Sequence, residues 1–354
     1  MVSEEVGKLV VATPPLLSKR KRIVFFALYS LILAVIFSLT AEVAIRLKGY
    51  GPYNGAEVAV RVEPGGKFYQ QHPTLGYTHL PGRFTVFFWD TSFVATLLPN
   101  TLRITHPLET YEAAKTKDEI WIFGCSFTEG WGLKDEETYP WLLQEKFPEY
   151  EIVNFGVGGY GTIHSLIQFR EALAAKTPKV AVLAYANFHD ERNTFSRQRQ
   201  KWVVTARNVG PVAQPYARFD GQGNLQYHFG VGDYKEFPLM RYSALVNYLE
   251  IKYDQLEDRL IHSHDVSKAL VLEMAKTASE HNIKFIVAGI ASSAGTLDVL
   301  NFAREHGISS IDISVDLKDP ANKLPDGHPN AVANRHFADK LAGLLRTEVL
   351  PAER

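Results

Sequence analysis

Cysteine is almost absent from this chain of 354 residues, which has a single one, Cys125. One cysteine cannot form an intramolecular disulfide, so packing must stabilise the fold, and a zinc site built from several cysteines is excluded. An excess of positive charge is absent too, because 38 Lys and Arg stand against 39 Asp and Glu. Without concentrated basic residues, nucleic acid is not an expected partner.

Motifs for metals and cofactors are also lacking. The glycine-rich stretch GVGGYG at 156–161 has neither the Lys-Ser/Thr ending of a phosphate-binding loop nor the acidic residue that binds ribose in a dinucleotide fold. Metal-ligand spacing is absent as well. We therefore expect no metal and no cofactor. A composition that is 46% hydrophobic and 22% charged allows at least one full-sized core.

A long uncharged apolar run is present near the N-terminus. The basic residues KRKR at 19–22 precede nineteen uncharged residues at 23–41, and such a run nearly crosses a hydrocarbon core of roughly 30 Å. A secretory signal peptide is the competing interpretation. Its apolar region would be shorter, and Leu39 and Glu42 stand where a cleavage site needs small residues.

These patterns predict a membrane-anchored chain. We expect a cytoplasmic segment at 1–22 and a single transmembrane anchor at 23–45, because basic residues crowd the N-terminal side. The remainder is then extracytoplasmic, either periplasmic or extracellular. Residues 46–117 are rich in Gly, Pro and aromatics and contain alternating stretches, which predict a small β-rich collar. The main domain is expected at 118–350.

Apolar runs alternate with stretches of helical spacing throughout this main domain. The runs are EIWIFG, EIVNFGV, KVAVLAY, IKFIVAGI and SSIDISV. Strand and helix in this rhythm imply parallel pairing with right-handed crossovers, so we predict an α/β fold, a three-layer α/β/α sandwich around a parallel sheet. Residues 191–257 interrupt the rhythm with Pro, Gly and Tyr. We interpret them as an insertion over the site that tunes specificity.

Four polar or glycine-rich segments lie where ligands bind in such a sheet, at the carboxyl ends of the strands. They are GCSFT at 124–128, NFGVGG at 154–159, NFHD at 187–190 and, before the last helix, DGHPN at 326–330.

A serine hydroxyl is a weak nucleophile until a base takes its proton. His328 is the candidate base for Ser126, and Asp326 is the nearest carboxylate to fix the tautomer of His328. Cys125 is a rival nucleophile, since a thiol near a helix start can be acidified. A buried neighbour of the nucleophile is the simpler interpretation of that cysteine.

The order and chemistry of the four segments resemble the sequence blocks of the SGNH (GDSL-like) hydrolases, over roughly residues 118–346 and without the insertion. The resemblance implies that Ser126 is the nucleophile and first oxyanion N–H, and that Asp326 orients His328. It further implies that Gly159 supplies a second oxyanion N–H and Asn187 a side-chain amide. The chain departs from the family pattern at Cys125, where aspartate is usual, at Tyr185 and Phe188 around Asn187, and in the spacing of Asp326 and His328.

By this resemblance we expect an extracytoplasmic serine esterase that cleaves a carboxylic ester of a carbohydrate or lipid through an acyl-enzyme. One alternative is an O-acyltransferase that modifies a cell-surface polysaccharide. Another is a catalytically silent domain that binds a glycan or a partner. His189 is a candidate substrate contact, although its acidic and basic neighbours also suit an ion-paired loop. His164 is expected on a helix surface.

Overall fold

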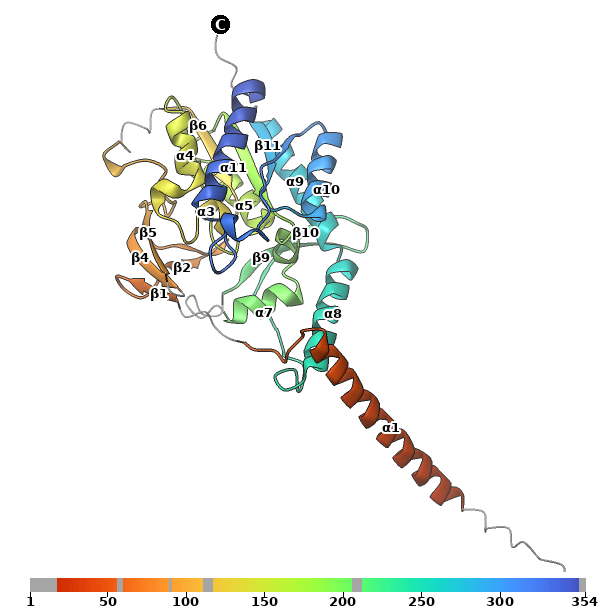
Figure 1. Cartoon of the computed structure of the whole chain (residues 1–354). Coiled ribbons are helices and arrows are strands. Elements are labelled where there is room, and N and C mark those ends of the chain that lie inside the picture. Colours follow the sequence, from red (N-terminus) through yellow and green to blue (C-terminus); the bar gives the residue numbers. More distant parts are fainter. Residues whose placement is uncertain (1–17, 56–59, 89–90, 111–116, 206–211, 350–354) are drawn as a thin grey trace, which may run out of the picture. The chain divides into compact units, whose positions relative to one another are not determined.

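The computed structural model divides the chain into two compact units, one of 1–54 with 236–251 and the other of 55–235 with 252–354 (Figure 1). The residues that it describes are 18–55, 60–88, 91–110, 117–205 and 212–349. Most of the predicted cytoplasmic segment, residues 1–17, therefore lies outside the described residues.

The first unit contains the long apolar helix α1 (Lys19–Leu47). Its most apolar window of 18 residues has a mean hydropathy of 2.5 and no buried residue. The helix is long and apolar enough to cross a membrane, and a signal sequence passes the same test. It covers the predicted anchor at 23–45 and extends beyond both of its ends.

The same unit includes the start of helix α8 (Ala244–Leu260). The Glu42 carboxylate on α1 accepts hydrogen bonds from the backbone N–H groups of Ala244 at 2.9 Å and Leu245 at 2.8 Å, and from the Ser243 hydroxyl at 2.7 Å. The first N–H groups of a helix lack intrahelical partners, so this carboxylate caps α8. Residues 236–251, which belong to the predicted insertion, thus pack with the predicted anchor.

The second unit is built on a five-stranded sheet of order β12-β11-β8-β6-β7 in which every pairing is parallel. All five strands coincide with the apolar runs predicted from the sequence. Their bounds are β6 Glu119–Phe123, β7 Glu151–Asn154, β8 Val180–Tyr185, β11 Lys284–Gly289 and β12 Ser309–Asp312.

Helices cover both faces of this sheet, which explains why its strands are apolar on both sides. Along β6, Ile120 and Ile122 face one core and Trp121 and Phe123 the other. The first core is covered by α4 (Tyr139–Lys146) and α11 (Ala331–Leu344), which pack together (Figure 1). The second is covered by α5 (Thr162–Ala172), α9 (Ser263–Glu280) and α10 (Ala294–Glu305). The predicted three-layer α/β/α architecture is confirmed.

A small antiparallel β segment precedes the sheet, as predicted. A three-stranded sheet of order β1-β4-β5 and a β2-β3 hairpin form it. The strands are β1 Val60–Glu63, β2 Tyr69–His72, β3 Gly76–His79, β4 Gly82–Phe88 and β5 Thr91–Leu97. The predicted insertion at 191–257 contains the helix α7 (Arg197–Thr205) and the hairpin β9 (Gln214–Phe219) and β10 (Leu225–Gly230), and it overlaps with α8 and with the short helix α6 (His189–Asn193).

The strand order also locates the site. From β6 the chain continues to β7 on one side, whereas from β8 it continues to β11 on the other. A crevice forms at such a switch point, outside the carboxyl ends of the two central strands. Ser126 follows β6 and Asn187 follows β8. The topology therefore brings two of the predicted site segments to the same place.

Candidate active site

Ser126 begins the short helix α3 (Ser126–Glu129), which starts three residues after β6 ends. The helix ends at Gly130, whose φ of 83° lies in the left-handed region. Ser126 is 9% exposed, whereas the preceding Cys125 is fully buried and packs in the core between the sheet and its helices. The thiol therefore has no exposed surface from which to attack a substrate.

Ser126, His328 and Asp326 form a continuous hydrogen-bonded chain. The Oγ atom of Ser126 lies 2.9 Å from Nε2 of His328, and Nδ1 of His328 lies 2.9 Å from Oδ2 of Asp326. The backbone N–H of His328 also donates to Oδ1 of Asp326 at 3.1 Å. With Nδ1–H donating to the carboxylate, Nε2 is left to accept the serine proton, which is the geometry that general-base activation needs.

Asp326 has a further donor that the sequence analysis missed. The indole Nε1–H of Trp131 donates to Oδ2 at 3.1 Å. Burial raises the pKa of the Asp326 carboxyl, but the hydrogen bonds and charge of His328, together with the Trp131 hydrogen bond, outweigh it, and the net pKa is lowered. The carboxylate therefore stays ionised beside the imidazole.

Trp131 is held by the β-rich collar. Its ring lies 5.5 Å from that of Phe88 and 5.3 Å from that of Phe93, centroid to centroid. Both phenylalanines belong to the collar core. The collar therefore positions a contact of the candidate site, in addition to linking the chain to its N-terminal helix.

Arg103 fixes the turn that follows α3. Its side chain is 1% exposed and donates through Nη1 to the carbonyls of Glu129 at 2.9 Å and Gly130 at 2.8 Å. It also donates through Nη2 to Leu133 O at 2.6 Å and through Nε to Asp135 at 2.9 Å. The buried guanidinium thus donates to several buried carbonyls of this turn, and no local sequence signal pointed to it.

The loop after β7 packs closely against α3. Asn154 Nδ2 donates to the carbonyl of Thr128 at 3.0 Å, and its Oδ1 accepts from Gly156 N–H at 2.9 Å. A Cβ atom at Gly156 would lie 2.3 Å from the backbone nitrogen of Glu129, so only glycine fits there. The glycine in this segment is therefore required by the approach of two backbones.

Gly159, the candidate oxyanion donor, has a φ of 80° and two carbonyls held around it. Tyr77 donates its hydroxyl to the carbonyl of Gly158 at 2.6 Å, and Arg199 Nη2 donates to the carbonyl of Gly159 at 2.8 Å. Within the described part of the chain, the Gly159 N–H has no acceptor. The loop therefore keeps its carbonyls occupied and leaves this N–H available.

Asn187 is exposed at the end of β8. Its backbone N–H donates to Thr296 Oγ1 at 3.2 Å, and its carbonyl accepts from Asp190 N–H at 3.1 Å. These bonds fix the backbone, while the side-chain amide has no protein acceptor among the residues described. The amide is therefore free to donate to a ligand.

The expectations for two histidines need correction. His189, predicted as a substrate contact, is fully buried, with its ring near those of Tyr185 and Phe188. His164, expected on a helix surface, is also fully buried and stacks on Tyr160 with 4.3 Å between centroids. Burial lowers the pKa of both well below the usual histidine range, because desolvation disfavours the charged ring.

Comparison with known proteins adds a likeness at the level of the fold. No family model and no curated protein sequence matches the chain. Several solved structures do match the chain. One is TesA, with 13% identity and a TM-score of 0.41 over 65% of this chain and 98% of that one. The esterase EstA from Pseudoalteromonas sp., in a structure inhibited by monoethylphosphonate, matches with 13% identity and a TM-score of 0.37 over 65% of this chain and 97% of that one.

A GDSL-like lipase from Bacteroides thetaiotaomicron matches with 14% identity and a TM-score of 0.36 over 69% of this chain and 96% of that one. The chain is thus similar to lipolytic esterases of the GDSL type. Because these TM-scores lie below 0.5, we infer an activity only from the geometry of the site. An aligned hydroxyl, imidazole and carboxylate is the arrangement that serine hydrolases share across unrelated folds.

Proposed function

We propose that this chain is a serine esterase of the SGNH type that cleaves a carboxylic ester through an acyl-enzyme. One observation carries the proposal. The Ser126 hydroxyl, the His328 imidazole and the Asp326 carboxylate are aligned with two contacts of 2.9 Å at the carboxyl edge of a parallel sheet. A domain that only bound a glycan or a partner would have no need of this alignment.

In this mechanism Ser126 Oγ attacks the ester carbonyl while His328 Nε2 takes its proton. The tetrahedral oxyanion accepts hydrogen bonds from the N–H groups of Ser126 and Gly159 and from the Asn187 amide, each worth about 3 kcal/mol of transition-state stabilisation. His328 then gives the proton to the leaving alcohol, and the C–O bond breaks to leave Ser126 acylated. Water, activated by the same imidazole, releases the acid.

The substrate is a carboxylic ester of a carbohydrate or lipid, reached from outside the cytoplasm. Two observations support this setting: helix α1 is long and apolar enough to span a membrane, and the basic residues 19–22 lie at its N-terminal end. The helix anchors the chain, and the α/β domain works on the extracytoplasmic side.

Hydrolysis of p-nitrophenyl acetate tests the proposal. Ser126→Ala should lower kcat/KM by about 10³-fold or more, because triad residues act as a unit and removing one loses most of their joint effect. Cys125→Ala is the matched control, since it truncates the adjacent side chain, and its rate should stay within about tenfold of the parent. Loss of activity in Cys125→Ala with full activity in Ser126→Ala would show that the nucleophile is the Cys125 thiol and not the Ser126 hydroxyl.

A further inference from the structure

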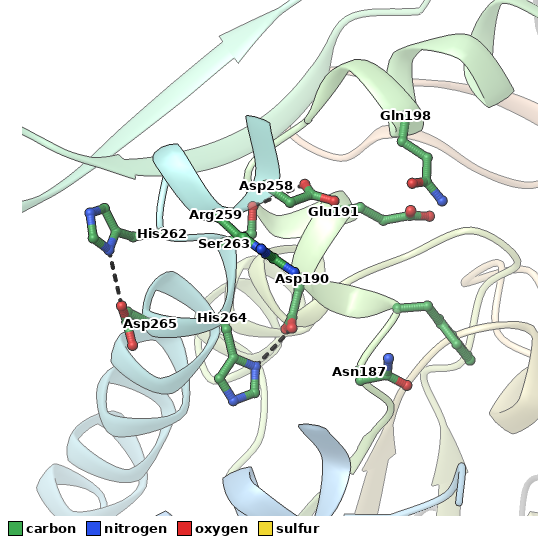
Figure 2. A pocket seen from close by; sticks show the side chains of 11 residues that line it. Asn187, Asp190, Glu191, Gln198, Asp258, Arg259, His262, Ser263, His264 and Asp265 are labelled. Carbon is green, nitrogen blue, oxygen red and sulfur yellow. Dashed lines mark hydrogen bonds and ion pairs between the residues drawn. The ribbon is translucent and has the colours of Figure 1, made fainter. Parts of the chain in front are cut away.

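A pocket of about 480 Å³ opens beside Asn187 in the second unit (Figure 2). It is lined from the end of β8, from α6 and α7, and from the junction of α8 and α9. Phe188 links it to the candidate catalytic residues, because its ring lies 5.4 Å from that of Phe127, whose ring lies 5.6 Å from His328. The pocket therefore adjoins the site, and its volume falls within the range of ligand sites.

Most of the residues that line this pocket have polar side chains. Phe188 is the one apolar side chain among the described residues that line it, and the others carry carboxylate, amide, hydroxyl, imidazole or guanidinium groups. An acyl chain placed here would remove water from these groups without replacing its hydrogen bonds, at a cost of about 1–3 kcal/mol for each group left unpaired. The pocket chemistry therefore disfavours a hydrocarbon ligand.

The charge of the lining residues further restricts the class of ligand that the pocket can bind. Four carboxylates, Asp190, Glu191, Asp258 and Asp265, stand against the single guanidinium of Arg259. Two of them already face a histidine, with Asp190 2.8 Å from His264 and Asp265 3.2 Å from His262. The lining is still acidic on balance, so an anionic ligand would be repelled.

The Glu191 carboxyl lacks a hydrogen-bond donor among the described residues. Its side chain is half-buried, and no described residue donates a hydrogen bond to its carboxyl, whose pKa is raised by burial. Gln198, from the start of α7, lines the same pocket (Figure 2). A ligand rich in hydroxyl groups would donate to the carboxylates and both donate to and accept from the amide.

We propose that this pocket binds the alcohol part of the ester, and that this alcohol is a neutral or amine-bearing carbohydrate unit. The inference rests on the proposed function in one respect, since it joins the pocket to ester cleavage at Ser126. It assigns the carbohydrate, and not a lipid or a uronic acid, as the substrate class.

Glu191→Leu tests the pocket by removing the unpartnered carboxyl while filling a similar volume. With acetylated xylotetraose as substrate, kcat/KM should fall about tenfold, mainly through KM. With p-nitrophenyl acetate, whose alcohol carries no sugar hydroxyls, it should stay within about twofold. Glu191→Gln, which keeps an acceptor, should recover most of the loss. Glu280→Leu, at an exposed position at the end of α9, is the matched control and should leave both rates unchanged.

Binding measured without catalysis separates this inference from the proposed function. In calorimetry, Ser126→Ala protein should bind xylotetraose and the chitosan tetramer, and the Glu191→Leu change should weaken both; tetragalacturonate should not bind. Glu191-dependent binding in a protein that hydrolyses no ester would refute the proposed function but support the assignment of the pocket as a carbohydrate site. Ser126-dependent hydrolysis of p-nitrophenyl acetate without any oligosaccharide binding would refute the pocket, as would equal losses for both esters in Glu191→Leu.

Discussion

The Asp326 carboxylate receives hydrogen bonds from His328 and from the Trp131 indole. The net lowering of its pKa means that it contributes stability above the carboxyl pKa of the unfolded chain, and that this contribution is lost as the pH falls through the folded pKa. Trp131→Phe keeps a ring against Phe88 and Phe93 but removes one donor. We expect a higher folded pKa for Asp326 and a several-fold lower kcat.

Urea unfolding as a function of pH checks the Trp131→Phe variant. The stability lost between pH 7 and pH 3 should be smaller in the variant than in the parent, because less of it comes from Asp326. Equal losses in the two proteins, together with an unchanged kcat, would show that the indole donor has no influence on the carboxylate.

Arg199 is a positioning residue for the Gly159 backbone, since it holds the Gly159 carbonyl at 2.8 Å, while Tyr77 holds the Gly158 carbonyl in the same peptide plane as the Gly159 N–H. Arg199→Met should lower kcat for p-nitrophenyl acetate about tenfold and leave KM nearly unchanged, because a misplaced oxyanion donor is felt only in the transition state. Tyr77→Phe, which frees the Gly158 carbonyl, should act in the same direction. A rise in KM at constant kcat would contradict this role, and thermal unfolding checks that each variant folds.

Several residues of the site were predictable from the sequence because each has a characteristic neighbour. Ser126 stands in a Gly-Cys-Ser turn after an apolar run, and Asp326 and His328 stand in a compact motif before the last helix. Trp131 and Arg199 were not predictable, since their partners lie far away in the chain: 195 residues for Asp326 and 40 for Gly159. His164 and His189 were wrongly predicted to be accessible, because the local sequence around each does not reveal which distant residues cover its side chain.

His264 joins three helices. Its ring lies 2.8 Å from Asp190 on α6 and 2.8 Å from Asp298 on α10, while His264 itself belongs to α9. The hydrogen bond to Asp190 raises the pKa of His264, burial lowers it, and the Asp190 charge and the Asp298 hydrogen bond tip the balance upward. The His264 ring therefore bridges the two carboxylates.

A raised histidine pKa has a definite effect on stability. The extra stability is fully present below the unfolded pKa of about 6.5 and is lost as the pH rises through the folded pKa. We expect chemical unfolding midpoints to fall between pH 6 and pH 9 in the parent protein and to change less in His264→Gln. A midpoint that rises over this range, or that falls equally in both proteins, would contradict the assignment.

The five sheet strands were predictable because strands buried on both faces read as continuous apolar runs. Helix α8 was not, although it is 17 residues long, because it lies inside a stretch whose Pro, Gly and Tyr content indicated only an interruption. Its start is capped by Glu42, some two hundred residues earlier in the chain. Ser243 also caps this start locally, because its hydroxyl accepts from the Val246 N–H at 3.2 Å, but one serine in such a stretch does not by itself indicate a helix of this length.

The proposed membrane anchor has a direct test. The full chain should stay in the membrane fraction at high salt, because salt screens surface charge and leaves the burial of apolar residues intact. A chain that starts at residue 50 should be soluble. It should also exchange the amide hydrogens of Ala244 and Leu245 faster, since Glu42 no longer caps α8. Release of the full chain by salt alone would refute the anchor.

Ser126 is the residue that becomes acylated in the proposed mechanism. A fluorophosphonate forms a stable adduct with an activated serine, and peptide mass spectrometry locates that adduct after digestion. We predict one phosphonyl group on Ser126 in the parent and in Cys125→Ala, and none in Ser126→Ala or His328→Ala. An adduct on any other residue, or full labelling of Ser126→Ala, would show that Ser126 is not the nucleophile.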